Sequence, residues 1–247
     1  MDNITNLEKL NPVVKKVLRP YLENFIRLNA DNLLSLMLYG SATGEDFVAG
    51  VSDINILAVF KRVRLEDLKK NLKLIAGGRR KNISAPLILS RAHIDTSKDT
   101  FPIEFLEIKD NYLLLYGEDI FSGIVIDQKY LRLFCEEQLK GKLIRIRQTY
   151  LEKGLKKKGI EAILKRSFNS LFPVFRSLLR LKDITPPAHK EKVVVRLEEV
   201  FGIKAELFIA LLRDKKNDEK ISGRDIELFL KDYLEEIEKM AYIIDRL

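Results

Sequence analysis

Cysteine, histidine and long apolar runs are scarce in this chain of 247 residues. The single cysteine, Cys135, excludes an intramolecular disulfide, and its place in a helical pattern predicts a small buried apolar residue. Two distant histidines, His93 and His189, with one cysteine argue against a zinc site, which needs a cluster of such ligands. No apolar run reaches the length of about 18 residues that a membrane-spanning helix needs, and the N-terminal segment lacks the pattern of a secretion signal. These shortages predict a cytoplasmic protein without a membrane partner.

Charge is plentiful but unevenly distributed. The chain is 46% hydrophobic and 32% charged, which is typical of a globular protein, and its net charge is +8. Residues 1–120 hold 17 basic and 16 acidic residues, whereas residues 127–182 hold 15 and 5, a net charge of +10. Two interpretations stay open: a solvated lysine-rich helix face, or a surface that attracts a polyanion or the triphosphate of a nucleotide. The basic and aromatic residues of this segment do not alternate, which argues against base stacking.

Two apolar segments, residues 33–39 and 54–60, predict buried strands separated by a polar linker. The first stops at Gly40, where a glycine lets the backbone approach a ligand closely. Ser41 then supplies a hydroxyl at the start of a predicted short helix, and the free N–H groups of a helix start can bind phosphate. This turn is therefore a candidate nucleotide-binding site.

The second strand opens on Asp53 and Asn55, whose i, i+2 spacing directs both side chains to one face. Oxygen ligands beside a phosphate-binding turn suit a hard cation such as Mg²⁺. Each short pattern by itself is also a common turn or cap. Their order between two apolar strands favours the functional interpretation.

Together Gly40-Ser41, the eleven-residue spacer 42–52 and Asp53-Ile54-Asn55 resemble the signature of the DNA polymerase beta-like nucleotidyltransferase superfamily. The departure is Asn55, where that superfamily carries an acid. The resemblance implies transfer of a nucleoside monophosphate from a nucleoside triphosphate, most simply ATP, to an acceptor. It also implies that Gly40 and Ser41 bind the nucleotide and that Asp53 and Asn55 hold the cofactor Mg²⁺ and take part in catalysis.

Residues 101–108 (FPIEFLEI) are predicted to form a later strand that carries two acids. The superfamily places a third carboxylate on a later strand, and both Glu104 and Glu107 fit that position. On a strand, residues three apart point to opposite faces, so only one could join Asp53. We choose Glu104 as the third catalytic and metal-binding acid because it lies deeper in the predicted strand. Alternatively, both acids are charges that protect a sheet edge.

Elsewhere the pattern is helical. A helix over residues 65–76 is expected to end at Gly77-Gly78. From Asp127 onward only helices are predicted, including one over residues 160–178 that Pro173 bends and a last one capped by Ser222.

The predicted fold is α+β. A nucleotidyltransferase domain with a mixed sheet (residues 1–122) precedes an all-α helical bundle (residues 123–247). This order resembles kanamycin nucleotidyltransferase and its relatives, which implies that the bundle helps to bind substrate and favours a homodimer. The acceptor stays open: a small molecule, a protein or an RNA end. The alternative function is a catalytically weak or inactive nucleotide-binding or interaction protein, which Asn55 favours.

Overall fold

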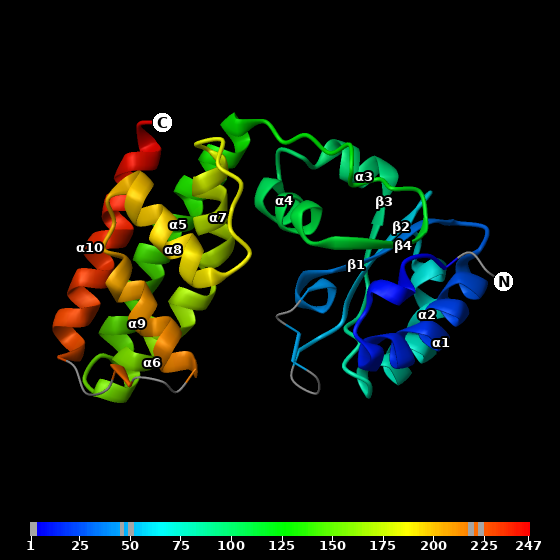
Figure 1. The fold of residues 1–247 in the computed structure, drawn as a ribbon, viewed down its shortest axis with the longest axis horizontal. Helices are drawn as coiled ribbons and strands as arrows, with labels where there is room; N and C mark the ends of the chain where they lie inside the picture. Colours follow the sequence, from blue (N-terminus) through cyan, green and yellow to red (C-terminus); the bar gives the residue numbers. More distant parts are fainter. Residues whose placement is uncertain (1–3, 45–46, 49–51, 217–219, 222–224) are drawn as a thin grey trace. The chain divides into compact units, whose positions relative to one another are not determined.

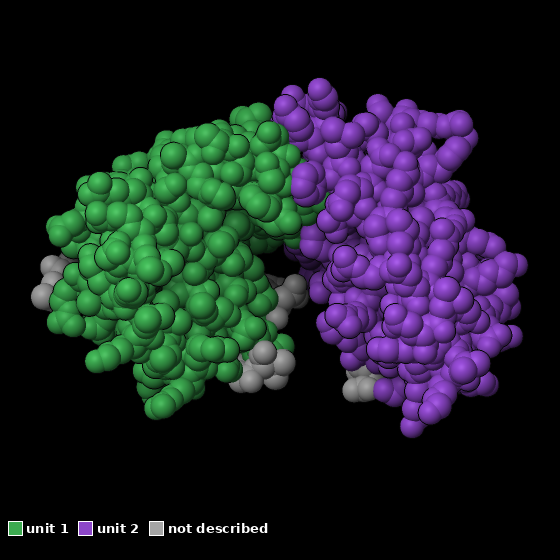
Figure 2. Space-filling view, turned by 180° about the vertical axis from the view of Figure 1, so that it is seen from behind, with its two compact units in different colours: residues 1–126 green, residues 127–247 purple. Residues whose placement is uncertain are grey.

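The chain forms two compact units, residues 1–126 and 127–247, shown in different colours in Figure 2. The computed structural model describes residues 4–44, 47–48, 52–216, 220–221 and 225–247. The first unit combines a sheet with helices and the second is helical (Figure 1). The predicted α+β fold class is therefore confirmed.

Among the described residues, the sheet of the first unit has four strands in the order β3-β2-β1-β4. The central strand β1 pairs antiparallel with both β2 and β4, and β3 pairs parallel with β2, so the sheet is mixed. The central strands are apolar on both faces because helices cover both faces. The strands are β1 (Leu33–Tyr39), β2 (Asn55–Phe60), β3 (Leu87–Ser90) and β4 (Tyr112–Gly117).

Helices on the two faces of the sheet bury two separate cores. Helices α1 (Pro12–Asn29) and α2 (Leu65–Arg79) lie on one face, and α3 (Arg91–Thr96) and α4 (Pro102–Asp110) on the other (Figure 1). The first core includes Val14, Leu22, Phe25, Leu36, Ile56 and Phe60, and the second includes Met37, Leu57, Val59, Phe105, Ile108 and Phe121. Two short 3-10 helices, η1 (Leu7–Lys9) and η2 (Gly40–Thr43), complete the unit.

The predicted strand at residues 101–108 is wrong, because this segment is helix α4. Short apolar runs do not distinguish a helix from a strand by their periodicity alone. Pro102 stands in the first turn, where its fixed φ suits a helix start, and Phe105 and Ile108 are buried one turn apart. Glu104 is exposed in the first turn, where a negative charge complements the helix dipole.

Helix α2 continues through the two glycines that were expected to end it. Gly78 is buried, and a Cβ built there would lie 2.8 Å from Cε2 of Tyr21 on α1. The glycine therefore lets α1 approach α2 closely. Gly77 next to it is exposed and has no atom within 4 Å of the corresponding Cβ position.

Alanine substitutions at these two glycines are expected to have opposite effects on stability. Gly77→Ala should raise the free energy of unfolding by up to about 1 kcal/mol, since alanine favours a helix. Gly78→Ala should lower it by about 1–3 kcal/mol, because the buried Tyr21 ring must move. Urea denaturation of both variants measures the difference, and equal stabilisation by both would rule out the close contact.

The second unit consists of α5 (Gln128–Lys153), α6 (Lys157–Asn169), α7 (Phe172–Arg180), α8 (Lys190–Phe201), α9 (Ala205–Lys216) and α10 (Ile226–Asp245). The single bent helix predicted over residues 160–178 is in fact two helices, because Pro173 stands in the first turn of α7. The expected cap Ser222 lies outside the described residues. Asp225 caps α10 and accepts hydrogen bonds from the backbone of Glu227 and Leu228.

Aromatic side chains fill the core of the second unit. The rings of Phe168, Phe172, Phe175, Phe208 and Tyr233 contact one another at centroid distances of 5.0–6.1 Å. The buried Tyr233 hydroxyl is 2.9 Å from the Ser167 hydroxyl. Cys135 is fully buried, as predicted, and burial raises the pKa of its thiol to about 12. Within the described ranges, no helix combines the length and apolarity needed to span a membrane.

Candidate active site

The predicted Gly-Ser turn lies at the end of β1. Gly40 has a φ of +77°, a left-handed conformation that favours glycine, and it turns the chain from β1 into η2. Its N–H donates to the carbonyl of Asn111 at 3.0 Å, and the Thr43 hydroxyl donates to its carbonyl at 2.8 Å. The turn is thus fixed to the start of β4. The half-buried Ser41 hydroxyl makes no hydrogen bond with the described residues.

Pairing of β1 with β2 brings Asn55 to this turn. Asn55 lies opposite Tyr39, and a Cβ built at Gly40 would lie 3.5 Å from the Asn55 Nδ2 atom. Asp53 precedes the start of β2 by two residues and is exposed. With respect to the described part of the chain, its carboxylate has no hydrogen bond or ion pair. The antiparallel register therefore places these residues at one end of the sheet.

The Asn55 side chain lies on the same face of β2 as Leu57 and Val59, because side chains alternate along a strand. Those two residues belong to the core that Phe105 and Ile108 of α4 complete. Helix α4 thus covers the face of the sheet on which the Asn55 side chain lies.

The two predicted third acids both lie on α4. Residues three apart are neighbours on a helix, so Glu104 and Glu107 do not point to opposite sides as they would on a strand. Asn111, whose carbonyl accepts from Gly40, follows the end of α4 directly. Glu107 is half-buried and lies one turn nearer to Asn111 than the exposed Glu104. Across the residues that the structure describes, no three His, Cys, Asp or Glu side chains form a ready metal cluster.

Two tyrosines beside the turn were not predicted as site residues. Tyr39 pairs with both Asn55 on β2 and Tyr112 on β4, which forms a row across the sheet. Burial raises the pKa of the Tyr39 phenol. Burial and a hydrogen bond of 2.7 Å to Asp119 raise the pKa of Tyr112 to about 12. Both phenols are therefore neutral at physiological pH. The sequence shows a tyrosine directly before Gly40. It does not show which residues pair with that tyrosine across the sheet.

The architecture matches a solved structure over nearly its whole length. That structure is spectinomycin adenyltransferase AAD(9) from Enterococcus faecialis with ATP and spectinomycin, at a TM-score of 0.53 and 14% sequence identity. The match covers 92% of this chain and 97% of that one. The chain has the fold of this nucleotidyltransferase. No family model and no curated protein matches the sequence.

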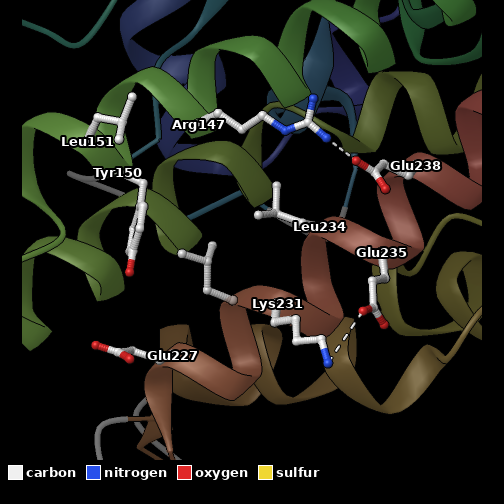
Figure 3. Close-up of a pocket in the computed structure, with 9 residues that line it drawn as sticks. Arg147, Tyr150, Leu151, Glu227, Lys231, Leu234, Glu235 and Glu238 are labelled. Atoms are coloured by element: carbon white, nitrogen blue, oxygen red, sulfur yellow. Dashed lines mark hydrogen bonds and ion pairs between the residues drawn. The ribbon is translucent and has the colours of Figure 1, made fainter.

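A separate pocket of about 450 Å³ lies within the second unit, between α5 and α10 (Figure 3). Leu151, Leu230 and Leu234 supply apolar walls. Two of its cations are already compensated, since Arg147 pairs with Glu238 and Lys231 pairs with Glu235. This pocket contains none of the predicted site residues, which all belong to the first unit.

Proposed function

We propose that this protein is a nucleotidyltransferase that transfers the nucleoside monophosphate of ATP to an acceptor in a Mg²⁺-dependent reaction. The observation that carries the proposal is that the Gly40-Ser41 turn and Asn55 lie next to each other at one end of the sheet. The fold supports it, since the adenyltransferase with the same architecture was solved with ATP.

Ser41 is the proposed contact for the triphosphate. Its hydroxyl has no hydrogen bond to any described residue, so it can donate to a phosphate oxygen. The Gly40 N–H is already bonded to Asn111, so we assign Gly40 a conformational role. It turns the chain and leaves room beside Asn55 where a larger side chain would stand.

The residues of the site fit a magnesium ion. Asp53 offers an exposed carboxylate without a competing partner among the described residues, and Asn55 offers an amide oxygen. Mg²⁺ commonly takes one or two protein oxygens and completes its shell with water and substrate phosphates. When bound, the ion supplies neutralisation of the triphosphate charge and polarises the phosphorus under attack.

In the proposed reaction, the acceptor oxygen bonds to the α-phosphorus of ATP while the bond to the bridging α–β oxygen breaks. Pyrophosphate leaves, and the acceptor proton passes to a base. We propose that α4 supplies this carboxylate. The sequence favours Glu104 as this base, but on a helix Glu107 is an equally suitable candidate. Separate Glu104→Gln and Glu107→Gln variants decide between them, because the base variant should lose turnover while it still binds ATP.

Asn55→Asp is expected to tighten Mg²⁺-dependent ATP binding by about ten-fold or more. Two unit charges about 4 Å apart attract by roughly 1–4 kcal/mol, depending on the effective dielectric constant, and a carboxylate that replaces the amide beside a doubly charged ion adds at least about this much. Calorimetric titration of ATP with and without Mg²⁺ into wild type and variant measures the change. Equal or weaker affinity in the variant would contradict the metal-site proposal.

The same titration separates the proposed enzyme from the alternative, a nucleotide-binding protein without turnover, which Asn55 favours. An ATP affinity that is the same with and without Mg²⁺, together with no release of pyrophosphate, would support that alternative. The acceptor screen begins with spectinomycin, because that compound is present in the structure with the same fold. Small hydroxylated molecules, proteins and RNA ends follow.

A further inference from the structure

Helix α2 turns an apolar face toward solvent. Leu65, Leu68 and Leu72 recur at the spacing of one helix face, and their exposed fractions are 61%, 37% and 62%. A helix on the surface of a domain normally turns such a face toward the core and its polar residues toward water. In α2 this order is reversed, because the buried residues include Asp67 and Asn71.

Hydrogen bonds to α1 fix this rotation of α2 about its own axis. The buried amides of Asn71 and Asn29 exchange two hydrogen bonds of 2.9 Å, and the Asn71 Nδ2 atom also donates to the Asp67 carbonyl. Gly78 faces the Tyr21 ring on the same side of the helix. Turning the leucines inward would break the amide pair and leave buried polar groups without partners, which is costly. The exposure of the leucines is therefore a fixed feature of the fold.

Positive charge surrounds these leucines. Residues 61–81 hold nine basic and two acidic residues, a net charge of +7, although residues 1–120 as a whole are nearly neutral. Lys69 is a neighbour of two of the leucines on the helix surface, and Lys73 lies one turn beyond. Both lysines are exposed, and neither has a carboxylate partner among the described residues. We call the following residues the α2 stripe: Leu65, Leu68, Lys69, Leu72 and Lys73.

We infer that the α2 stripe attaches the first unit to the surface of an anionic lipid bilayer. A helix with leucines on one face and lysines beside them lies in the plane of a bilayer, with its leucines among the acyl chains and its lysines at the lipid phosphates. This attachment needs no membrane-spanning helix. The prediction of no membrane partner rested on the lack of such a helix and of a secretion signal, so it does not bear on a surface contact.

Two other occupants fit the α2 stripe less well. A nucleic-acid backbone binds through its phosphates and makes no use of exposed leucines. A second copy of the chain would bring two surfaces of the same charge together, and like charges repel. An anionic bilayer matches both halves of the observation, because its negative headgroups lie directly above apolar chains.

Flotation with lipid vesicles tests the inference. Wild type is expected to bind phosphatidylcholine vesicles that contain about one third phosphatidylglycerol, and to bind phosphatidylcholine alone much more weakly. Leu65→Gln/Leu72→Gln should weaken binding to the anionic vesicles about ten-fold or more, because glutamine keeps the helix but loses the apolar contact. Lys69→Gln/Lys73→Gln should weaken it about five-fold for each lysine. The matched control is Leu228→Gln on α10 of the second unit, where the leucine is 53% exposed, and it should bind like wild type.

A fluorescent side chain on the stripe reports whether it enters the lipid. The chain contains no tryptophan, so Leu72→Trp introduces a single indole. Its emission is expected to shift to shorter wavelength when anionic vesicles are added, since the ring moves from water to the membrane interface. Leu228→Trp is the control, and its emission should stay unchanged.

Four results would overturn the inference. The first is no binding of wild type to the anionic vesicles at about 0.1 M salt, where the Debye length is about 10 Å. The second is undiminished binding by Leu65→Gln/Leu72→Gln, which would leave charge attraction alone. The third is self-association of wild type that this variant abolishes, which would assign the leucines to a second copy. The fourth is RNA binding that Lys69→Gln/Lys73→Gln abolishes and the leucine variant keeps, together with no vesicle binding.

This inference is independent of the proposed active site. Leu65→Gln/Leu72→Gln should keep the wild-type rate of pyrophosphate release, since neither leucine belongs to that site. Asp53→Ala should keep wild-type binding to anionic vesicles. Failure of the membrane attachment and failure of the proposed transferase activity are therefore distinguishable.

Discussion

Replacing Asp53 with alanine is expected to lower the rate of pyrophosphate release from ATP by about 1,000-fold or more. Asp53 is the only carboxylate in the proposed pair of metal ligands, and bound Mg²⁺ is worth several kcal/mol of charge stabilisation. Each loss of about 1.4 kcal/mol slows the reaction ten-fold. Pyrophosphate leaves whatever the acceptor is, so a coupled pyrophosphate assay with a pool of acceptors measures the effect.

The fold should survive this substitution. Asp53 is exposed and has no hydrogen bond or ion pair with the described residues, so its removal should change the free energy of unfolding by less than about 0.5 kcal/mol. The control is Asp31→Ala, which removes one exposed carboxylate beside the opposite end of β1. Asp31→Ala should keep wild-type turnover. Full activity in Asp53→Ala would end the proposal at this site.

Gly117→Ala is expected to be the most destabilising single-methyl change in the first unit, by about 3 kcal/mol or more. Gly117 closes β4 with a φ of +78°, which costs an alanine about 1–2 kcal/mol. A Cβ there would lie 1.9 Å from the Leu34 carbonyl oxygen, so β4 must also move away from β1. Since whole domains are stable by about 5–15 kcal/mol, this loss is large.

Urea denaturation followed by a probe in each unit is the measurement. The transition of the first unit should shift to lower urea, whereas that of the second should not. Gly123→Ala is the matched control, because that glycine has open space around the Cβ position and an ordinary φ. A Gly117→Ala protein as stable as this control would mean that β4 does not pair with β1 as described. Movement of β4 should also disturb the contact between Asn111 and Gly40, and with it the proposed site.

The order of the strands, the glycine turn and the candidate site residues along the chain could be predicted from the sequence. Two apolar runs of strand length, one ended by Gly40 and one opening on Asp53, predicted two strands joined by a turn and a linker. This worked because a buried strand and a glycine turn are local features, set by side-chain type and backbone sterics. The change to helical periodicity after Asp127 predicted the second unit for the same reason.

Segments with conflicting local signals were decided by tertiary packing. The composition of residues 101–108 (FPIEFLEI) suits either a strand or a helix. The segment forms helix α4 because Phe105 and Ile108, one turn apart, are both buried in the core that α4 covers. Gly78 looked like a helix end, but the Tyr21 ring requires a small residue there within a continuing helix. Pro173 looked like a bend and instead starts a new helix.

The sequence by itself determined the α+β class, the Gly-Ser turn and the neighbouring pair Asp53 and Asn55, because each depends on residues close in the chain. Only the tertiary structure decided which groups surround that pair. The register of β1 with β4 brought Tyr112 beside Tyr39, and the hydrogen bond from Gly40 to Asn111 tied the turn to the end of α4. Such contacts join residues about 70 positions apart, and they follow from the burial of whole helix and sheet faces, which no local pattern records.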